Sequence, residues 1–331
     1  MIKTVRFYEF GDADVLKLDD LPLTEPGKGE IRLKVKAIGL NRAEVAFRER
    51  QYIENAENFP AILGYEASGI IDAVGEGVTE FQIGDRVSTI PGFSIKEYGV
   101  YGESAIVPAA MAAKYPEKLS PQEGTAIWMQ YITAYGALVE YGQIKSGDFV
   151  LISSASSSVG SAAIQITKAA GATAIATTRG ESKKQTLLNN GADYVIVTNH
   201  EDLPTRVMEI TNGQGANLIF DPVAGSFLET LANTAARGAT IIEYGALSSE
   251  MTPFPLFPAL QKGLKIQGYT LFEIADDPVK LEKAKQYIYD GLESGKLIPI
   301  LDRSFPLEQI SEAHRYMESN QQQGKIVVIV N

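Results

Sequence analysis

The chain has 331 residues, a formal net charge of −11 and no cysteine, which excludes disulfides and thiolate chemistry. Its length predicts two domains, and its acidic charge disfavours nucleic acid and anionic membrane surfaces as partners. Because no segment has the pattern of a signal peptide or a transmembrane helix, we expect a cytoplasmic protein.

Residues 1–123 predict a β-rich domain with few helices. Short strands are separated by Gly and Pro turns, among them Ile31–Ile38, Ala67–Val74 and Arg86–Ile90. Frequent turns between short apolar runs are typical of antiparallel sheets.

Residues 124–269 have a different rhythm, in which strands alternate with helices. This alternation predicts a doubly wound parallel sheet with right-handed crossovers. The predicted strands are Phe149–Ser154, Thr173–Thr178, Tyr194–Val197, Asn217–Phe220, Ala239–Glu243 and Lys265–Gln267. The helices between them include Val159–Ala170, Ser182–Asn190, Leu203–Ile210 and Phe227–Ala235.

Residues 270–331 contain two helical patterns, Pro278–Ser294 and Leu307–Ser319, and a final strand, Lys325–Val330. The final strand is almost wholly apolar, so we expect it to be buried in a sheet. We predict that this segment returns to the first domain.

A loop of small residues joins the strand at 149–154 to the helix after it. The dinucleotide fingerprint G-x-G-x-x-G maps onto Ala155, Ser157 and Gly160, so two glycines are replaced by residues nearly as small. Small side chains let the backbone approach a pyrophosphate, and the helix N-terminus supplies unpaired N–H groups. Such a turn is also common in any α/β fold, so the loop alone leaves both interpretations open. The contacts expected with a cofactor are Ala155, Ser156, Ser157, Ser158, Val159 and Gly160.

Two cations follow the second strand of this region. The strand ends at Thr178, and Arg179 and Lys183 come after it. A site specific for NAD places an acidic residue near here to bind the ribose 2′-hydroxyl. Cations instead suit the 2′-phosphate of NADPH, although both could be solvated charges at a helix start. We predict an NADPH site that includes Thr178, Arg179 and Lys183.

Further motifs follow one another along the chain. They are Asn41-Arg42-Ala43-Glu44 with Arg48, Pro60–Gly69 with Val74-Gly75, Gly84–Val87, Thr133–Tyr135, Asp221–Gly225 and Gly324–Val327. In this order they resemble the medium-chain dehydrogenase/reductase superfamily, and more narrowly its zinc-independent quinone oxidoreductase branch. The resemblance implies a GroES-like substrate domain, a Rossmann cofactor domain and an NADPH-dependent oxidoreductase.

The chain departs from the zinc-dependent members of that superfamily. They carry Gly-His-Glu where this chain has Gly64-Tyr65-Glu66, and catalytic zinc needs three protein ligands. The chain has two histidines, His200 and His314, and neither has a partner at ligand spacing. We expect both to be structural or surface residues, and we expect no metal.

Without zinc, hydride from NADPH can add to a quinone or to an alkene conjugated with a carbonyl. The protein must then supply a proton or hydrogen bond to the developing oxyanion. Tyr52 is the candidate donor, with packing as its alternative role. Asn41 is similar to a family residue near the nicotinamide ribose, and a turn-capping role is an equal alternative.

The resemblance also implies further cofactor contacts. They lie in a helix at 128–138, whose apolar face is otherwise typical of a core, and after the fifth and sixth strands of the sheet. These candidates are Gln130, Thr133, Gly245, Ala246, Leu247, Leu271 and Phe272.

Two classes of function remain open from the sequence. The first is an NADPH-dependent reductase of quinones or of carbonyl-conjugated alkenes. The second is an NADPH-binding protein with a structural or regulatory role. In either case the resemblance implies a homodimer joined through the Rossmann domains near Thr240–Tyr269. The apolar stretch Pro253–Leu260 fits a buried contact at this place. The alternative is that this stretch covers the edge of its own sheet.

Overall fold

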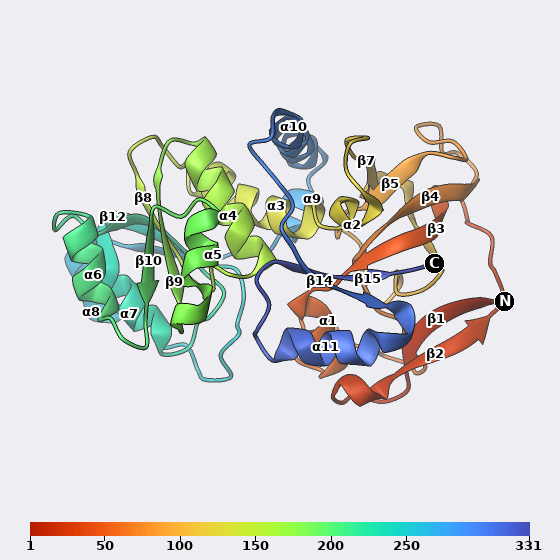
Figure 1. Cartoon of the computed structure of the whole chain (residues 1–331), viewed down its shortest axis with the longest axis horizontal. Coiled ribbons are helices and arrows are strands. Elements are labelled where there is room, and N and C mark those ends of the chain that lie inside the picture. The colour runs from red at the N-terminus through yellow and green to blue at the C-terminus, as the bar shows by residue number, and fades with distance from the viewer. The chain divides into compact units, whose positions relative to one another are not determined.

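The computed structural model describes every residue from 1 to 331, and the chain forms two compact units (Figure 1). The first unit comprises residues 1–129 and 299–331, and the second comprises Gln130–Ile298. The second unit extends past residue 269 because helices α9 (Phe272–Ala275) and α10 (Pro278–Ser294) belong to it. The functional division into 1–123, 124–269 and 270–331 stays a prediction.

The second unit is built on a six-stranded parallel sheet with the order β10-β9-β8-β11-β12-β13. The chain starts at the central strand β8, extends the sheet to one side, and then returns to extend the other side from β11. The order therefore reverses between β8 and β11, which is the switch point of a Rossmann fold. The predicted doubly wound sheet is confirmed. The strands are β8 Phe149–Ile152, β9 Thr173–Thr178, β10 Tyr194–Val197, β11 Ala216–Asp221, β12 Ala235–Glu243 and β13 Lys265–Gly268.

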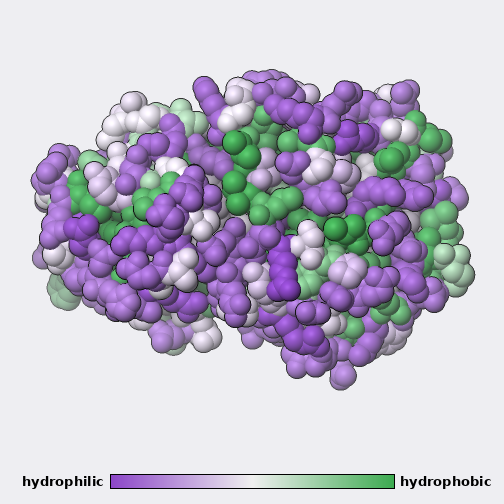
Figure 2. All heavy atoms as spheres, viewed as in Figure 1, coloured by the Kyte–Doolittle hydropathy of each residue, from purple (hydrophilic) through white to green (hydrophobic).

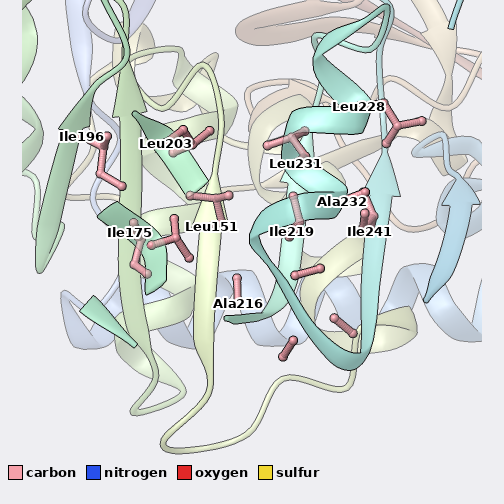
Figure 3. Close-up of a cluster of buried hydrophobic side chains, with 14 residues drawn as sticks. Leu151, Ile175, Ile196, Leu203, Ala216, Ile219, Leu228, Leu231, Ala232 and Ile241 are labelled. Carbon is pink, nitrogen blue, oxygen red and sulfur yellow. The ribbon is translucent and has the colours of Figure 1, made fainter. Parts of the chain in front are cut away.

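Figure 3 shows the hydrophobic core on one face of this sheet. Neighbouring strands each contribute an aliphatic side chain to it, and helices α6 (Leu203–Ile210) and α7 (Phe227–Thr234) cover it. Side chains of a strand alternate between its two faces, so one inward residue from each strand lines up across the sheet. The sheet residues in this row are Leu151, Ile175, Ile196, Ile219 and Ile241, all at most 1% exposed.

Capping residues set the ends of the helices around the sheet. The Ser157 side chain accepts a hydrogen bond from the Gly160 amide at the start of α4. The Asp277 side chain accepts hydrogen bonds from the Val279 and Lys280 amides at the start of α10. Gly295 ends α10 at φ 74°, a left-handed conformation that favours glycine. The remaining helical segments are α3 Trp128–Tyr135, a π-helical turn Gly136–Tyr141, α4 Ser158–Ala169, a 3₁₀ turn Glu181–Lys183, α5 Lys184–Asn189 and α8 Leu256–Lys262.

The first unit is rich in β-structure, as predicted. One sheet pairs β1 (Ile2–Phe7) with β2 (Leu16–Leu21), and the other has the order β14-β15-β3-β4-β5-β7 with β6 also on β3. The predicted final strand is β15 (Lys325–Ile329), which is buried and pairs with β3 of the first unit. The other elements are β3 Glu30–Gly39, α1 Arg42–Arg48, β4 Glu66–Val74, β5 Arg86–Thr89, β6 Ser104–Pro108, β7 Ala112–Lys114, α2 Pro121–Gly124, β14 Leu301–Pro306 and α11 Ile310–Glu318, with 3₁₀ turns at Ala13–Val15, Ala109–Met111 and Leu307–Gln309.

Hydrophilic residues dominate the face of the molecule in Figure 2, and hydrophobic residues appear there as separate patches. None of the helices combines the length and the apolar character needed to cross a membrane.

Candidate active site

The small-residue loop after β8 has the geometry of a phosphate-binding turn. Ser154 adopts a positive φ of 46°, and Ser157 Oγ then accepts the Gly160 N–H at 3.0 Å. A Cβ on Gly160 would lie 2.5 Å from the carbonyl oxygen of Ala155, so only glycine fits there. The third fingerprint position thus has its expected role of close helix–strand packing, and the first turn of α4 leaves N–H groups for an anion.

One of the two predicted cations lies at this loop. Lys183 Nζ donates a hydrogen bond to Ser156 Oγ at 3.1 Å. Arg179 follows β9 and is exposed, while Thr178 is buried at the strand end. Lys183 therefore brings a positive charge to the loop on which the sequence predicts the phosphates.

The carboxyl ends of β8, β11 and β12 meet at the same edge of the sheet. Asp221 accepts hydrogen bonds from the amides of Val223 at 3.0 Å and Ala224 at 2.7 Å, and from the hydroxyl of Ser153. Beyond β12, the Leu247 amide donates to the Pro222 carbonyl at 2.9 Å. The predicted contacts Gly245, Ala246 and Leu247 thus follow β12 at this edge, where all three are exposed.

A second carboxyl lies beside Asp221. Glu243 is its register partner on β12, and both of its carboxylate oxygens are buried without a hydrogen-bond partner. Burial and the neighbouring Asp221 charge raise the pKa of Glu243 to about 9. Both effects favour the protonated form of Glu243.

The other predicted contacts of the second unit are mostly buried. Gln130 in α3 is 1% exposed, and its Oε1 has no hydrogen-bond partner. Thr133 is buried one turn further on, and Leu271 is buried just before α9, which begins at Phe272. The unpartnered oxygen of Gln130 is an acceptor that a bound amide could satisfy.

Asn41 belongs to a buried polar cluster in the first unit. Its Nδ2 lies 3.2 Å from Glu44 Oε1 and 3.2 Å from Glu66 Oε2, and its Oδ1 accepts from Lys325 Nζ at 2.6 Å. Glu44 also accepts from the amides of Asn41 and Tyr65, so it fixes the start of α1. The Asn41 amide is therefore engaged within its own unit, and a cofactor contact stays a prediction.

Burial also acts on Glu44. It raises the pKa of Glu44 to about 7, while Lys325 and the surrounding hydrogen bonds oppose that rise. Glu66 accepts from the Met129 amide at 2.8 Å and pairs with Lys325. Both carboxylates accept hydrogen bonds from the backbone of their own unit.

Tyr52 and Tyr65 form a hydroxyl pair near this cluster. Tyr65 is fully buried, and its hydroxyl donates to the Tyr52 oxygen at 3.3 Å. Burial raises the pKa of Tyr52 to about 12, although the Tyr65 bond opposes it. The Tyr52 hydroxyl is consequently protonated at neutral pH, and its own proton can be donated elsewhere.

Two protein-family models and several known proteins match this chain. Residues 158–285 match the model of the zinc-binding dehydrogenase family, and residues 27–117 match the alcohol dehydrogenase GroES-like domain. The chain is 31% identical to human quinone oxidoreductase over 336 residues, which cover all of this chain and 98% of that protein. The chain belongs to the quinone oxidoreductase family.

Two further relatives bear on the site. The chain superposes on the structure of Escherichia coli quinone oxidoreductase complexed with NADPH with a TM-score of 0.92, at 28% identity over 99% of this chain and 100% of that one. It is 26% identical to 2-haloacrylate reductase from Burkholderia, over 99% of each chain.

The residues of the second unit fit the dinucleotide that this family uses. The close packing of Gly160 on Ala155 holds the N-terminus of α4 against the loop, where the helix N–H groups suit a pyrophosphate. Lys183 supplies a cation beside the loop for a phosphate, and Gln130 offers an unpartnered acceptor for a carboxamide.

The histidines of this family member are placed as structural or surface residues. His314 is fully buried, with Nε2 3.3 Å from the Tyr101 hydroxyl, and burial lowers its pKa to about 3. His200 is exposed. No group of three His, Asp or Glu side chains is placed to hold a metal ion. The predicted independence from zinc remains to be checked by elemental analysis of the purified protein.

Sequence reasoning missed Glu243 and Lys325. Glu243 stood at the end of a predicted strand, but only the strand order places it opposite Asp221. Lys325 lies 284 positions from Asn41, and the closing Gly324-Lys325 motif was the only signal for it.

Proposed function

We propose that this NADPH-dependent reductase acts on small molecules in which a carbon–carbon double bond is conjugated with a carbonyl, quinones included. The observation that carries the proposal is the Tyr52–Tyr65 pair. In this pair the Tyr52 hydroxyl is uncharged and protonated, so it can donate a hydrogen bond to a substrate carbonyl. Support also comes from 2-haloacrylate reductase, a relative whose name denotes a conjugated alkene as its substrate.

NADPH, when bound, supplies the hydride that such an acceptor takes at its electron-poor carbon. The residues of the chain have the complementary task of stabilising charge on the carbonyl oxygen. Tyr65 donates to Tyr52, which orients the Tyr52 oxygen and leaves its proton for the substrate. Positioned proton donors of this kind contribute about 10²- to 10⁴-fold to a rate.

Tyr52 is expected to matter more for an enone than for a quinone. A reduced quinone is already stabilised by its aromatic ring, whereas an enolate depends on the hydrogen bond. We expect Tyr52→Phe to slow enone reduction by about 10²-fold and quinone reduction by less. The measurement is steady-state NADPH oxidation against a panel of quinones and α,β-unsaturated carbonyls, with product analysis.

Tyr289→Phe is the matched control, because Tyr289 is an exposed tyrosine in the second unit. If both rates of Tyr52→Phe stay within about twofold of the parent, as in the control, Tyr52 only packs. If the parent binds NADPH but reduces no acceptor in the panel, the alternative of a nucleotide-binding structural or regulatory protein takes precedence.

We further propose that NADPH is preferred over NADH through Arg179 and Lys183, and that the protein is a homodimer joined through its second units. For the dimer, support comes from the side chains of Phe254, Phe257 and Leu260, which are 62%, 74% and 71% exposed. They lie on and before α8, in the segment that precedes β13, the edge strand of the parallel sheet. A concentrated apolar surface beside a sheet edge fits a symmetric contact.

A further inference from the structure

A turn at residues 93–98 lies beside the segment that carries Tyr52. Phe93 is 5% exposed, and its ring packs against the Tyr65 ring with centroids 5.7 Å apart. The Ser94 carbonyl accepts two amides of the same turn, at 3.1 Å and 3.0 Å. The turn is therefore anchored in the first unit, and it contacts the tyrosine that bonds Tyr52.

Residues 52–60 depend on side chains for their position. They belong to no helix or strand, and their backbone makes no hydrogen bond to other backbone groups. Glu54 accepts a hydrogen bond from the Ser94 hydroxyl. A second contact joins Lys96 to Glu57 at 2.7 Å, but the Glu57 side chain is 72% exposed, so solvent weakens this ion pair. The Glu54–Ser94 bond is thus the better shielded of the two links.

Glu54 lies two residues after Tyr52 in the sequence, so its bond to the turn limits where Tyr52 can lie. The Tyr52 hydroxyl accepts from Tyr65 at 3.3 Å, and the two rings meet edge to face with centroids 6.3 Å apart. Burial is the main cause that raises the pKa of Tyr52, and the charges of Glu44 and Glu54 add to that rise. Glu54 therefore also favours the protonated hydroxyl that a hydrogen-bond donor needs.

We propose that Glu54 is a positioning residue for Tyr52, which acts through its bond to Ser94 and holds the Tyr52 hydroxyl against Tyr65. The inference rests on the proposed function, in which Tyr52 is the donor. A donor that is free to turn away from its substrate loses the alignment on which its effect depends. Neither Glu54 nor Ser94 has to touch the substrate.

Ser94→Ala tests this, because it removes the hydroxyl and leaves Glu54 and Tyr52 in place. The first readout is the NMR signal of labelled tyrosine Cζ without any acceptor, with Tyr52 and Tyr65 assigned from their phenylalanine variants. We expect Ser94→Ala to shift the Tyr52 signal, and Ser94→Thr, which restores a hydroxyl, to recover the parent signal. Lys96→Met is the matched control, because it breaks only the exposed link between the same segments.

The second readout is steady-state reduction of an enone at saturating NADPH. Ser94→Ala should lower kcat about 3- to 10-fold, the range of one lost hydrogen bond, and should leave the KM of NADPH unchanged. In a Tyr52→Phe background, Ser94→Ala should have no further effect, because the hydroxyl that it positions is gone.

The inference is overturned if Ser94→Ala leaves the Tyr52 signal unchanged, if Ser94→Thr behaves like Ser94→Ala, or if Ser94→Ala acts equally with and without the Tyr52 hydroxyl. A Tyr52 signal that shifts as expected, in a protein whose Tyr52→Phe variant reduces enones at the parent rate, would refute the proposed function and support the positioning of Tyr52 by Glu54.

Discussion

Arg179 and Lys183 give the clearest test of cofactor choice at single residues. Lys183 also bonds Ser156, so its removal would disturb the loop, whereas Arg179 is exposed and can be changed alone. Charge-assisted hydrogen bonds contribute roughly 1.5–3 kcal/mol each before exposure weakens them. We expect Arg179→Ala to raise the Kd of NADPH about tenfold and to leave that of NADH within about twofold.

The measurement is titration with each cofactor. Lys184→Ala is the control, because Lys184 is the neighbouring cation and pairs with Glu181 on the surface. Equal affinity of the unaltered protein for NADPH and NADH would contradict the proposed preference.

Glu243 predicts a pH dependence of stability. Its pKa rises from 4.5 to about 9 on folding, so the folded state binds more protons than the unfolded state between these values. Glu243 therefore contributes stability that is present below about pH 4.5 and is lost as the pH rises toward 9. Glutamine imitates the protonated carboxyl without titrating.

We expect the urea midpoint of the parent to fall, relative to that of Glu243→Gln, between pH 6 and pH 9. The difference between the two proteins isolates Glu243 from Glu44, whose pKa is also raised. A difference that stays constant over this range would show that Glu243 is already ionised at neutral pH.

At the scale of elements, β15 is held in place by a buried ion pair as well as by its apolar side chains. Lys325 is 1% exposed and pairs with Glu66 on β4, while it donates to Asn41 before α1. Removal of one partner leaves the other charge buried and uncompensated, which costs about 3–5 kcal/mol.

We therefore expect Lys325→Met to lower the free energy of unfolding by about that amount, as measured by urea denaturation. Lys114→Met is the control, since its partner Asp85 is also an acidic residue but Lys114 is more than half exposed. A loss below about 1 kcal/mol at Lys325 would mean that the apolar strand alone holds β15 in the sheet.

The same elements show how far the sequence could predict the structure. The parallel strands were found because their residues are apolar and are followed by small residues or helix caps, which are local signals. The pairing of Asp221 with Glu243 could not be predicted, because it depends on which strands become neighbours in the sheet. The Asn41–Lys325 bond joins residues 284 positions apart, and no local pattern encodes such a contact. At the phosphate loop, by contrast, Gly160 could be predicted because its constraint comes from Ala155, five residues away.

At the scale of the whole molecule, the proposed dimer can be tested directly. We expect light scattering at micromolar concentration to give about twice the chain mass of 35.9 kDa. The substitutions Phe257→Asp and Leu260→Asp together should yield a monomer, because charges do not tolerate burial in an apolar contact.

Ile83→Asp is the matched control, since Ile83 is 68% exposed and lies in the first unit. A parent protein of one chain mass would rule out the dimer. A dimer that survives the double substitution would place the contact elsewhere.

The insertion of the second unit into the sequence of the first also sets an order for biosynthesis. A ribosome releases residues 130–298 before the segment that contains β14, α11 and β15. Until then, the edge of β3 that pairs with β15 is open, and Glu66 has no Lys325 to neutralise it. The second unit can therefore fold while the chain is still bound to the ribosome. The first unit can complete its sheet only after its last segment is released. Protease treatment of ribosome-bound chains that expose residues up to 298 but not 299–331 should spare the second unit and digest residues 1–129.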